Sequence, residues 1–306
     1  MTHIDDSLAR GMAHAFLGHV AESDRICEER KERYYGRGRL PRSDNLKGYR
    51  KAVEHMRAWT PERYRICEWT AQQGKKAVWC GARLTRSDRV VPEGLAVELN
   101  EVTASGSAQT WTLGVTVSFH ALQRVIQRSG QIKPPFAPGK LDPLYAEFNS
   151  LPVWAIPALY AAKRLDREDR ARSSMLIPAE HGAWLCTDAG RNGLVVKTYL
   201  GEGADMWSEA QRALGQLRGF HERDLAPFHA AVFYPEWGWS IDEDVVKELH
   251  RVWHEWEWLN REREDRPGRD DRAWAEHRLQ RGGTSGSVMP PVFCLPQGVT
   301  GDTTCQ

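Results

Sequence analysis

Apolar residues recur every four positions near the start of the chain and alternate with polar residues further on, so helices and then strands are predicted. The first sixty residues are predicted to be helical, and the apolar positions with helical spacing are Leu8, Met12, Phe16 and Val20. Asp6 or Ser7 is expected to cap this helix. A second helix is predicted from Leu46 to Trp59, because Thr60-Pro61 disfavours its continuation.

Strand patterns dominate the next sixty residues. The runs 64–70 and 77–84 flank a Gln-Gln-Gly-Lys turn and predict a hairpin. Alternating apolar and polar positions predict further strands at 95–100 and 111–117. Four short strands with tight turns indicate an antiparallel sheet.

The run SFHALQRVIQRSG, residues 118–130, has the period of an amphipathic helix. Its apolar positions, Phe119, Leu122, Val125 and Ile126, fall within one arc of roughly 120°. On nearly the opposite side, His120, Arg124 and Arg128 follow one another at i+4 steps. Ser118 is expected to cap the helix and Gly130 to end it.

The remaining pattern predicts a second group of strands between helices. Residues 141–172 are predicted to be helical with interruptions at Pro152 and Pro157, and 174–178, 183–187 and 194–200 form a three-stranded meander. Helices are expected at 205–220 and 241–264. The predicted class is α+β, a mostly antiparallel sheet with helical N- and C-terminal regions. Its segments are a helical 1–60, an α+β core at 61–201, a Trp-rich helical 202–280 and a flexible tail at 281–306.

Composition narrows the class of protein. The chain has 306 residues, 41% hydrophobic and 27% charged, as in water-soluble globular proteins. No apolar run approaches the ~20 residues that span a bilayer, and the N-terminus does not resemble a signal peptide. The six cysteines form no C-x-x-C pair, which predicts a reducing, cytoplasmic setting without a zinc-knuckle site. We expect no metal and no cofactor, since glycine-rich phosphate loops are absent too.

Charge is distributed unevenly around the amphipathic helix. The formal net charge of the chain is only +1, with 42 basic and 41 acidic residues. Between Glu101 and Asp142, however, there is no acidic residue, and this window holds Arg124, Arg128, Lys133 and Lys140. Arginine suits phosphate because its planar fork binds two oxygens, and histidine suits proton transfer near neutral pH. A solvated helix face paired with acids elsewhere in the fold explains the same pattern, and both interpretations stay open.

The pattern His120-Ala121-Leu122-x-Arg124-x-x-x-Arg128 resembles the opening helix of a small bacterial domain family placed near the RelE-like toxin ribonucleases. The hairpin at 182–201 is similar to the sheet that accompanies that helix. The resemblance covers at most a quarter of the chain, and the flanking regions have no counterpart. It implies an endoribonuclease that needs no metal. Proton transfer would then fall to His120 or His181, charge stabilisation to Arg124, Arg128 and Lys197, and RNA binding to Lys133, Lys140 and Arg191.

A second hypothesis is a non-catalytic interaction protein. Of 13 tryptophans, six lie between residues 237 and 274: Trp237, Trp239, Trp253, Trp256, Trp258 and Trp274. Indoles fill cores, anchor protein interfaces or stack on bases. In this hypothesis the C-terminal helices dock a protein partner, and an exposed apolar patch is expected there. His250 and His254, one helical turn apart, are spaced like a metal pair but lack the glutamate of H-E-x-x-H and an evident third ligand.

Overall fold

The computed structural model describes residues 4–35, 45–87, 90–132, 142–164, 174–189, 193–202, 206, 208–220, 222–239 and 241–264. The chain divides into two units, 1–264 and 265–306. The second unit, which includes the predicted tail at 281–306, lies outside the described residues.

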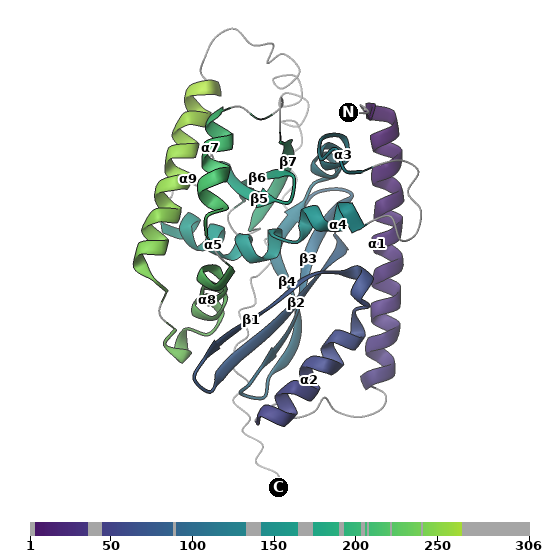
Figure 1. The fold of residues 1–306 in the computed structure, drawn as a ribbon. Helices are drawn as coiled ribbons and strands as arrows, with labels where there is room; N and C mark the ends of the chain where they lie inside the picture. The colour runs from purple at the N-terminus through teal and green to yellow at the C-terminus, as the bar shows by residue number, and fades with distance from the viewer. Residues whose placement is uncertain are drawn as a thin grey trace, which may run out of the picture. The chain divides into compact units, whose positions relative to one another are not determined.

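A seven-stranded sheet organises the described residues (Figure 1). Its strands are β1 (Arg65–Gln73), β2 (Lys76–Ser87), β3 (Gly94–Thr103), β4 (Ala108–Val117), β5 (Ser174–Ala179), β6 (Gly182–Asp188) and β7 (Leu194–Gly201), in the spatial order β1-β2-β3-β4-β7-β6-β5. All neighbours are antiparallel except β4 and β7, which pair in parallel over three residues each. The α+β class with a mostly antiparallel sheet is confirmed.

The short parallel pairing joins the two predicted groups of strands into one sheet. Val115–Val117 of β4 pairs with Leu194–Val196 of β7. Just before β7, Gly193 has a φ of 76°, and a Cβ there would overlap the carbonyl of Gly114. Only glycine therefore allows the two backbones to approach this closely.

Helices surround the sheet, and the hydrophobic spacing anticipated most of them. They are α1 (Asp6–Tyr35), α2 (Leu46–Trp59), α3 (Phe119–Arg128), α4 (Asp142–Phe148), α5 (Leu151–Arg164), α7 (Ser208–Leu217), α8 (Glu222–Phe233) and α9 (Glu243–Glu264), with short 3-10 turns η1 (Glu62–Tyr64) and η3 (Pro235–Trp237). As predicted, the Ser118 hydroxyl caps α3 by accepting the backbone N–H of Ala121 at 3.1 Å.

The structure corrects three details of these helices. Asp5, not Asp6 or Ser7, caps α1, because its side chain accepts the Leu8 N–H at 2.8 Å. Helix α5 continues through Pro157, and the break between α4 and α5 falls at residues 149–150 instead. Helix α8 lies inside the segment 202–280 that is predicted to be helical, but it was not one of the individual helices expected there, and Pro227 stands in its middle.

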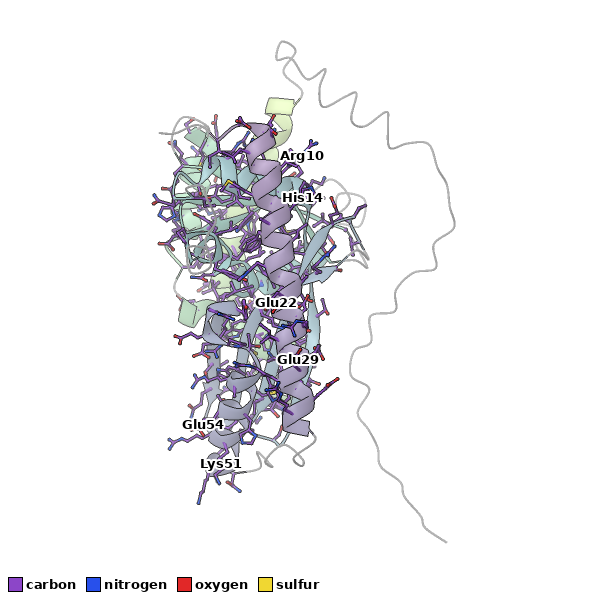
Figure 2. The ribbon with its side chains drawn as sticks, turned by 90° about the vertical axis from the view of Figure 1, so that its right-hand side faces the viewer. Arg10, His14, Glu22, Glu29, Lys51 and Glu54 are labelled. Carbon is purple, nitrogen blue, oxygen red and sulfur yellow. The ribbon has the colours of Figure 1, made fainter. Side chains whose placement is uncertain are left out.

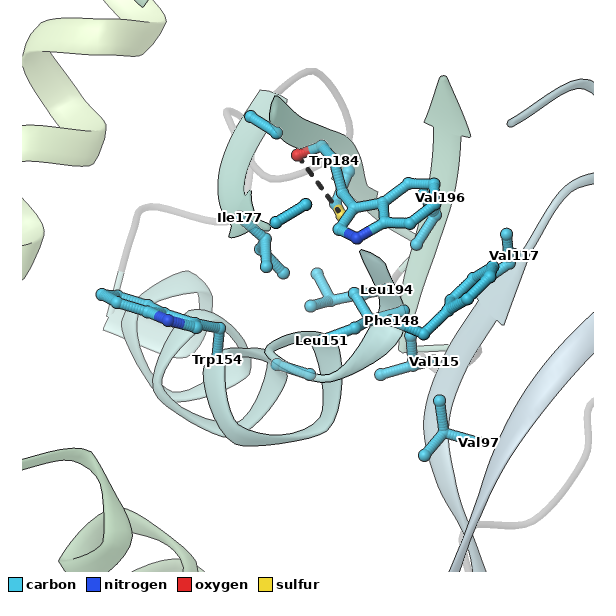
Figure 3. Close-up of a cluster of buried hydrophobic side chains, with 14 of the residues drawn as sticks. Val97, Val115, Val117, Phe148, Leu151, Trp154, Ile177, Trp184, Leu194 and Val196 are labelled. Atoms are coloured by element: carbon cyan, nitrogen blue, oxygen red, sulfur yellow. Dashed lines mark hydrogen bonds between the residues drawn. The ribbon is translucent and has the colours of Figure 1, made fainter. Parts of the chain in front are cut away.

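The two faces of β2 pack against different helices. Val78, Cys80, Ala82 and Leu84 point into the main core, whereas Ala77 and Trp79 lie under α2 in a second, smaller cluster. The main core takes residues from α1, α3, α4, α5, α7, α8 and α9, so the predicted segments 1–60 and 61–201 and the described part of 202–280 share it. At its centre, Phe148 stacks on Trp184 with ring centroids 4.9 Å apart (Figure 3).

The outer face of α1 is covered with charges of both signs (Figure 2). Glu22 and Glu29 lie on this face and both pair with Arg25. On the inner face of the helix, Phe16 and Val20 are fully buried. This is the division expected of a helix that covers a core.

Candidate active site

Helix α3 lies along β7, beyond the point where β4 stops pairing with it. At the start of the helix, the Ser118 N–H donates to the Val196 carbonyl at 3.1 Å. Its hydroxyl donates to the Lys197 carbonyl at 3.2 Å. At the end of the helix, the Arg128 guanidinium donates to the Tyr199 carbonyl at 3.1 Å. The helix thus satisfies carbonyls of β7 that β4 does not reach.

The polar side of α3 does not converge on a single point. Arg124 donates to Gln127 at 2.9 Å and lies 4.0 Å from the carboxylate of Asp6 on α1. His120 is exposed at the start of the helix and Arg128 is half-buried at its end. The two positions are eight residue steps apart on the helix, which is about 12 Å along the axis. Any shared site must therefore extend along the helix.

Two of the predicted site residues come to the same end of β7. Gly201, the last residue of β7, pairs with Gly182, which follows His181. On its other side, a Cβ at Gly201 would overlap the Arg128 carbonyl. His181 and Arg128 therefore flank the end of this strand. Lys197 is exposed further back along β7, near the start of α3, and Lys133, Lys140 and Arg191 lie outside the described residues.

A wholly buried carboxylate holds the ring of His181. Glu147 on α4 is 0% exposed, and one of its oxygens lies 2.9 Å from the His181 Nδ1. Its other oxygen accepts the His181 backbone N–H at 3.1 Å and the Tyr199 hydroxyl at 2.8 Å. The His181 side chain itself is 38% exposed. With Nδ1 directed at Glu147, Nε2 is the ring nitrogen left for a substrate.

Close packing around the β5–β6 turn brings these groups together. The Trp184 indole N–H donates to the Glu147 carbonyl at 2.9 Å, which anchors α4 on β6. A Cβ at Gly182 would overlap the Tyr199 ring and the Leu200 carbonyl, so glycine is required beside His181. Burial, and then the neighbouring Glu147, raises the pKa of Tyr199 well above its usual value. Its hydroxyl therefore stays protonated and acts as a donor to Glu147.

A cation and an anion line the same turn. Arg218, just after α7, donates to the carbonyls of Ala179 and Glu180 at 2.8 and 3.0 Å. It also forms an ion pair with Glu202, whose backbone N–H donates to the His181 carbonyl at 3.1 Å. A half-exposed histidine oriented by a buried carboxylate, with guanidinium groups nearby, has the arrangement of a general acid–base site.

His181 and Arg128 are candidates from the sequence, whereas Glu147, Tyr199 and Arg218, which lie beside them in the structure, were not among the predicted site residues. Glu147 lies in the short helix α4, and no spacing in the sequence links it to the hairpin that carries His181. The one available sign was a glutamate within an otherwise apolar run at 144–148. Such a charge on a core-facing helix requires a buried partner.

The other sequence candidates are arranged as follows. His250 and His254 stack on α9 with ring centroids 6.1 Å apart, and neither belongs to the group of three metal-type ligands that the described residues form. Of the C-terminal tryptophans, Trp253 and Trp256 are buried, and Trp237 and Trp239 are partly buried against the main core. The side chains of Trp258 and Trp274 lie outside the described part of the chain.

No family model, no curated protein and no solved structure matches this chain. The resemblance of the α3 pattern to the RelE-like neighbourhood therefore stays a prediction. Among the described residues, no helix combines the length and the apolar character that crossing a membrane requires.

Proposed function

We propose that the protein is an acid–base enzyme in which His181 transfers protons and Glu147 orients its ring. The observation that carries this proposal is the 2.9 Å contact between the His181 Nδ1 and a carboxylate that is 0% exposed. A buried anion at Nδ1 fixes the orientation of the ring and stabilises the imidazolium that forms when Nε2 takes a proton.

We further propose that the substrate is RNA and that the reaction is cleavage through its 2′-hydroxyl. Nε2 of His181 removes the proton of the 2′-hydroxyl, and the 2′-oxygen then attacks the adjacent phosphorus. The bond from phosphorus to the 5′-oxygen breaks, and that oxygen takes a proton from a water molecule. The hydroxide left behind takes the proton from Nε2 of His181, which returns the imidazole to its neutral form. The products are a 2′,3′-cyclic phosphate and a free 5′-hydroxyl.

Two guanidinium groups at this end of the sheet support an anionic substrate. Arg128 lies on one side of the end of β7, and Arg218 lies beside the β5–β6 turn. The Arg218 side chain is 37% exposed, and its partner Glu202 is 46% exposed, so a phosphate can compete for this arginine. Arginine is the residue best suited to the charge that develops on a phosphorane.

The alternative, an interaction module built on the Trp-rich helices, has no comparable support in the described residues. It requires an exposed apolar patch, and Leu8, at 41%, is the one large hydrophobic side chain that is exposed among the described residues. The described tryptophans of α9 are buried, and the indole of Trp253 donates to the Leu176 carbonyl at 2.9 Å. These contacts are those of core residues.

The proposal is tested by incubating the purified full-length chain with end-labelled RNA oligonucleotides and with DNA of the same sequences. We expect RNA but not DNA to be cut, with 2′,3′-cyclic phosphate ends. His181→Ala is expected to lower the rate about 10²–10⁴-fold, as loss of a general base does. His254→Ala, which removes an exposed histidine from α9, serves as the matched control and keeps the wild-type rate.

Circular dichroism and thermal unfolding of each variant show whether the fold is retained. Intact RNA across a range of pH and sequence overturns the proposed reaction. Equal rates for His181→Ala and the wild type overturn the assignment of His181. Cleavage of DNA as fast as RNA overturns the role of the 2′-hydroxyl.

A further inference from the structure

A row of side chains crosses four strands on the main-core face of the sheet, away from His181. Trp69 on β1 pairs with Cys80 on β2, Cys80 pairs with Glu101 on β3, and Glu101 pairs with Gln109 on β4. Helix α8 packs over this row and contributes His229. Directly paired residues on neighbouring strands have their side chains on the same face. The thiol of Cys80, the carboxylate of Glu101 and the imidazole of His229 therefore lie close together.

The donor atoms of three of these residues converge. The His229 Nε2 lies 2.7 Å from an oxygen of Glu101 and 3.3 Å from the Cys80 sulfur. The same Glu101 oxygen and the Cys80 sulfur are 3.8 Å apart. All three side chains are buried: Cys80 and Glu101 are 0% exposed and His229 is 1% exposed.

The environment of Glu101 is unusual for a carboxylate in a protein core. Burial alone would raise its pKa, but hydrogen bonds from His229, Tyr234 and Gln109 outweigh burial, and the pKa lies below its usual value. Glu101 is therefore an anion inside the core. Tyr234 and Gln109 both contact the oxygen that faces away from Cys80 and His229. The second oxygen is thereby held toward the sulfur and the imidazole nitrogen.

We propose that Cys80, Glu101 and His229 bind one divalent cation of the zinc class. Thiolate sulfur, imidazole nitrogen and carboxylate oxygen are the ligands that Zn²⁺ takes in proteins. Tetrahedral zinc with ordinary bond lengths separates such atoms by about 3.3–3.6 Å. The observed separations are 2.7, 3.3 and 3.8 Å. For an ion to enter, the imidazole nitrogen and the carboxylate oxygen must move apart by about 0.6 Å, and each distance to the sulfur must change by about 0.3 Å.

A hydrolytic triad explains the same residues less well. In such a triad the nucleophile and the carboxylate contact opposite nitrogens of the imidazole. Here both Cys80 and Glu101 face Nε2 of His229, and Nδ1 has no hydrogen-bond partner among the described residues. The rings of Trp69 and Phe233 pack on the histidine with centroids 5.7 and 4.9 Å away. Convergence of three donors on one point is the arrangement of a metal site.

Binding has a defined proton balance. Burial, followed by the nearby Glu101, raises the pKa of Cys80, so the metal-free sulfur carries its proton. The metal binds the thiolate, and the thiol proton passes to the solvent. The ion would also join α8 to β2 and β3, because its three ligands come from these elements.

The test uses the full chain with Cys294→Ser and Cys305→Ser, so that the thiols of the C-terminal unit do not bind metal. The protein is refolded with Zn²⁺ or Co²⁺ and passed over a desalting column, and bound metal is measured by mass spectrometry. We expect one ion per chain. With Co²⁺ we expect a thiolate-to-cobalt charge-transfer band in the near ultraviolet and the visible bands of tetrahedral cobalt.

Cys80→Ala is expected to abolish the charge-transfer band. Cys186→Ala is the matched control, because Cys186 is an equally buried cysteine of the same sheet whose sulfur contacts a backbone carbonyl, and it retains the band. Proton release on addition of Zn²⁺, followed with a pH indicator, checks the site without any variant in this cluster. Failure of the refolded chain to retain metal overturns the proposal, as does equal retention by the Cys80→Ala and Cys186→Ala variants.

Discussion

Replacing Glu147 with glutamine tests whether its buried charge organises the end of the sheet. The change keeps the size of the side chain and removes the charge. Three donors point at this carboxylate: the Tyr199 hydroxyl at 2.8 Å, the His181 Nδ1 at 2.9 Å and the His181 backbone N–H at 3.1 Å. Glutamine has one acceptor oxygen instead of two, so at least one donor loses its partner and meets an N–H₂ group.

The expected loss of stability follows from these contacts. A hydrogen bond to a charged group contributes about 1.5–3 kcal/mol, and leaving a buried partner unsatisfied adds a penalty of similar size. Since glutamine retains part of the network, we expect Glu147→Gln to lower the free energy of unfolding by about 3–5 kcal/mol, as breaking a buried ion pair does. The melting temperature should fall by about 10 °C.

Urea unfolding followed by tryptophan fluorescence measures this change, and Trp184, which donates to the Glu147 carbonyl, lies beside the perturbed group. Glu54→Gln is the matched control, because Glu54 is exposed on α2 and its replacement should stay within about 0.5 kcal/mol of the wild type (Figure 2). Tyr199→Phe and the double variant complete a thermodynamic cycle in which the coupling should exceed about 0.5 kcal/mol. A Glu147→Gln protein as stable as the Glu54→Gln protein would refute the reasoning.

Three further predictions concern other parts of the fold. Gly193→Ala should destabilise the protein by at least about 2 kcal/mol in urea unfolding, because it combines a positive φ with overlap on β4, whereas Gly74→Ala has the same sign of φ but open space and should lose less. Arg83→Met should lower the free energy of unfolding by about 3–5 kcal/mol, because it leaves a nearly buried carboxylate without this partner. Arg83 is 2% exposed and donates at 2.7 Å to Glu98, which is 14% exposed. Adding Glu98→Leu removes that carboxylate and should restore much of the lost stability. Burial, and then the neighbouring carboxylate of Glu147, raises the pKa of Tyr199. The contribution of this hydroxyl to the free energy of unfolding is therefore fully present below the usual tyrosine pKa of about 10, and it is lost as the pH rises above that value. Equilibrium unfolding across this alkaline range should show stability falling with pH, and Tyr199→Phe should make the fall less steep.

Much of the fold could be predicted because each element carries its own period. The alternating positions of β4 and the i, i+3, i+4 spacing of α3 are local properties, and the Ser118 cap follows from its place before Phe119. The parallel pairing of β4 with β7 was not predictable in this way. It joins residues about eighty positions apart, and Gly193, which permits it, lies within a run that reads as an ordinary Asn-Gly turn.

The candidate sites were harder to predict because their residues come together only through tertiary packing. His229 lies on α8, and Pro227 interrupts the helical pattern of that segment. The contacts of His229 with Cys80 and Glu101 could therefore not be predicted from the spacing of residues in the sequence. The pattern of α3 was visible, yet Arg128 contacts a backbone carbonyl of β7. A period identifies the exposed side of a helix, but it does not identify what that side meets.

The two buried glutamates show how similar groups of side chains lead to different proposals. Glu147 and Glu101 are both 0% exposed, and each accepts a hydrogen bond from a tyrosine and contacts a histidine. Glu147 meets the Nδ1 of a histidine that is 38% exposed, so Nε2 remains for a substrate. Glu101 meets the Nε2 of His229, which is 1% exposed and also faces a sulfur, so no substrate the size of a nucleotide reaches this nitrogen without local opening of the core. The two groups contain similar residues, but they differ in the exposure of the histidine and in which of its nitrogens contacts the glutamate. These two differences favour proton transfer at His181 and ion binding at His229.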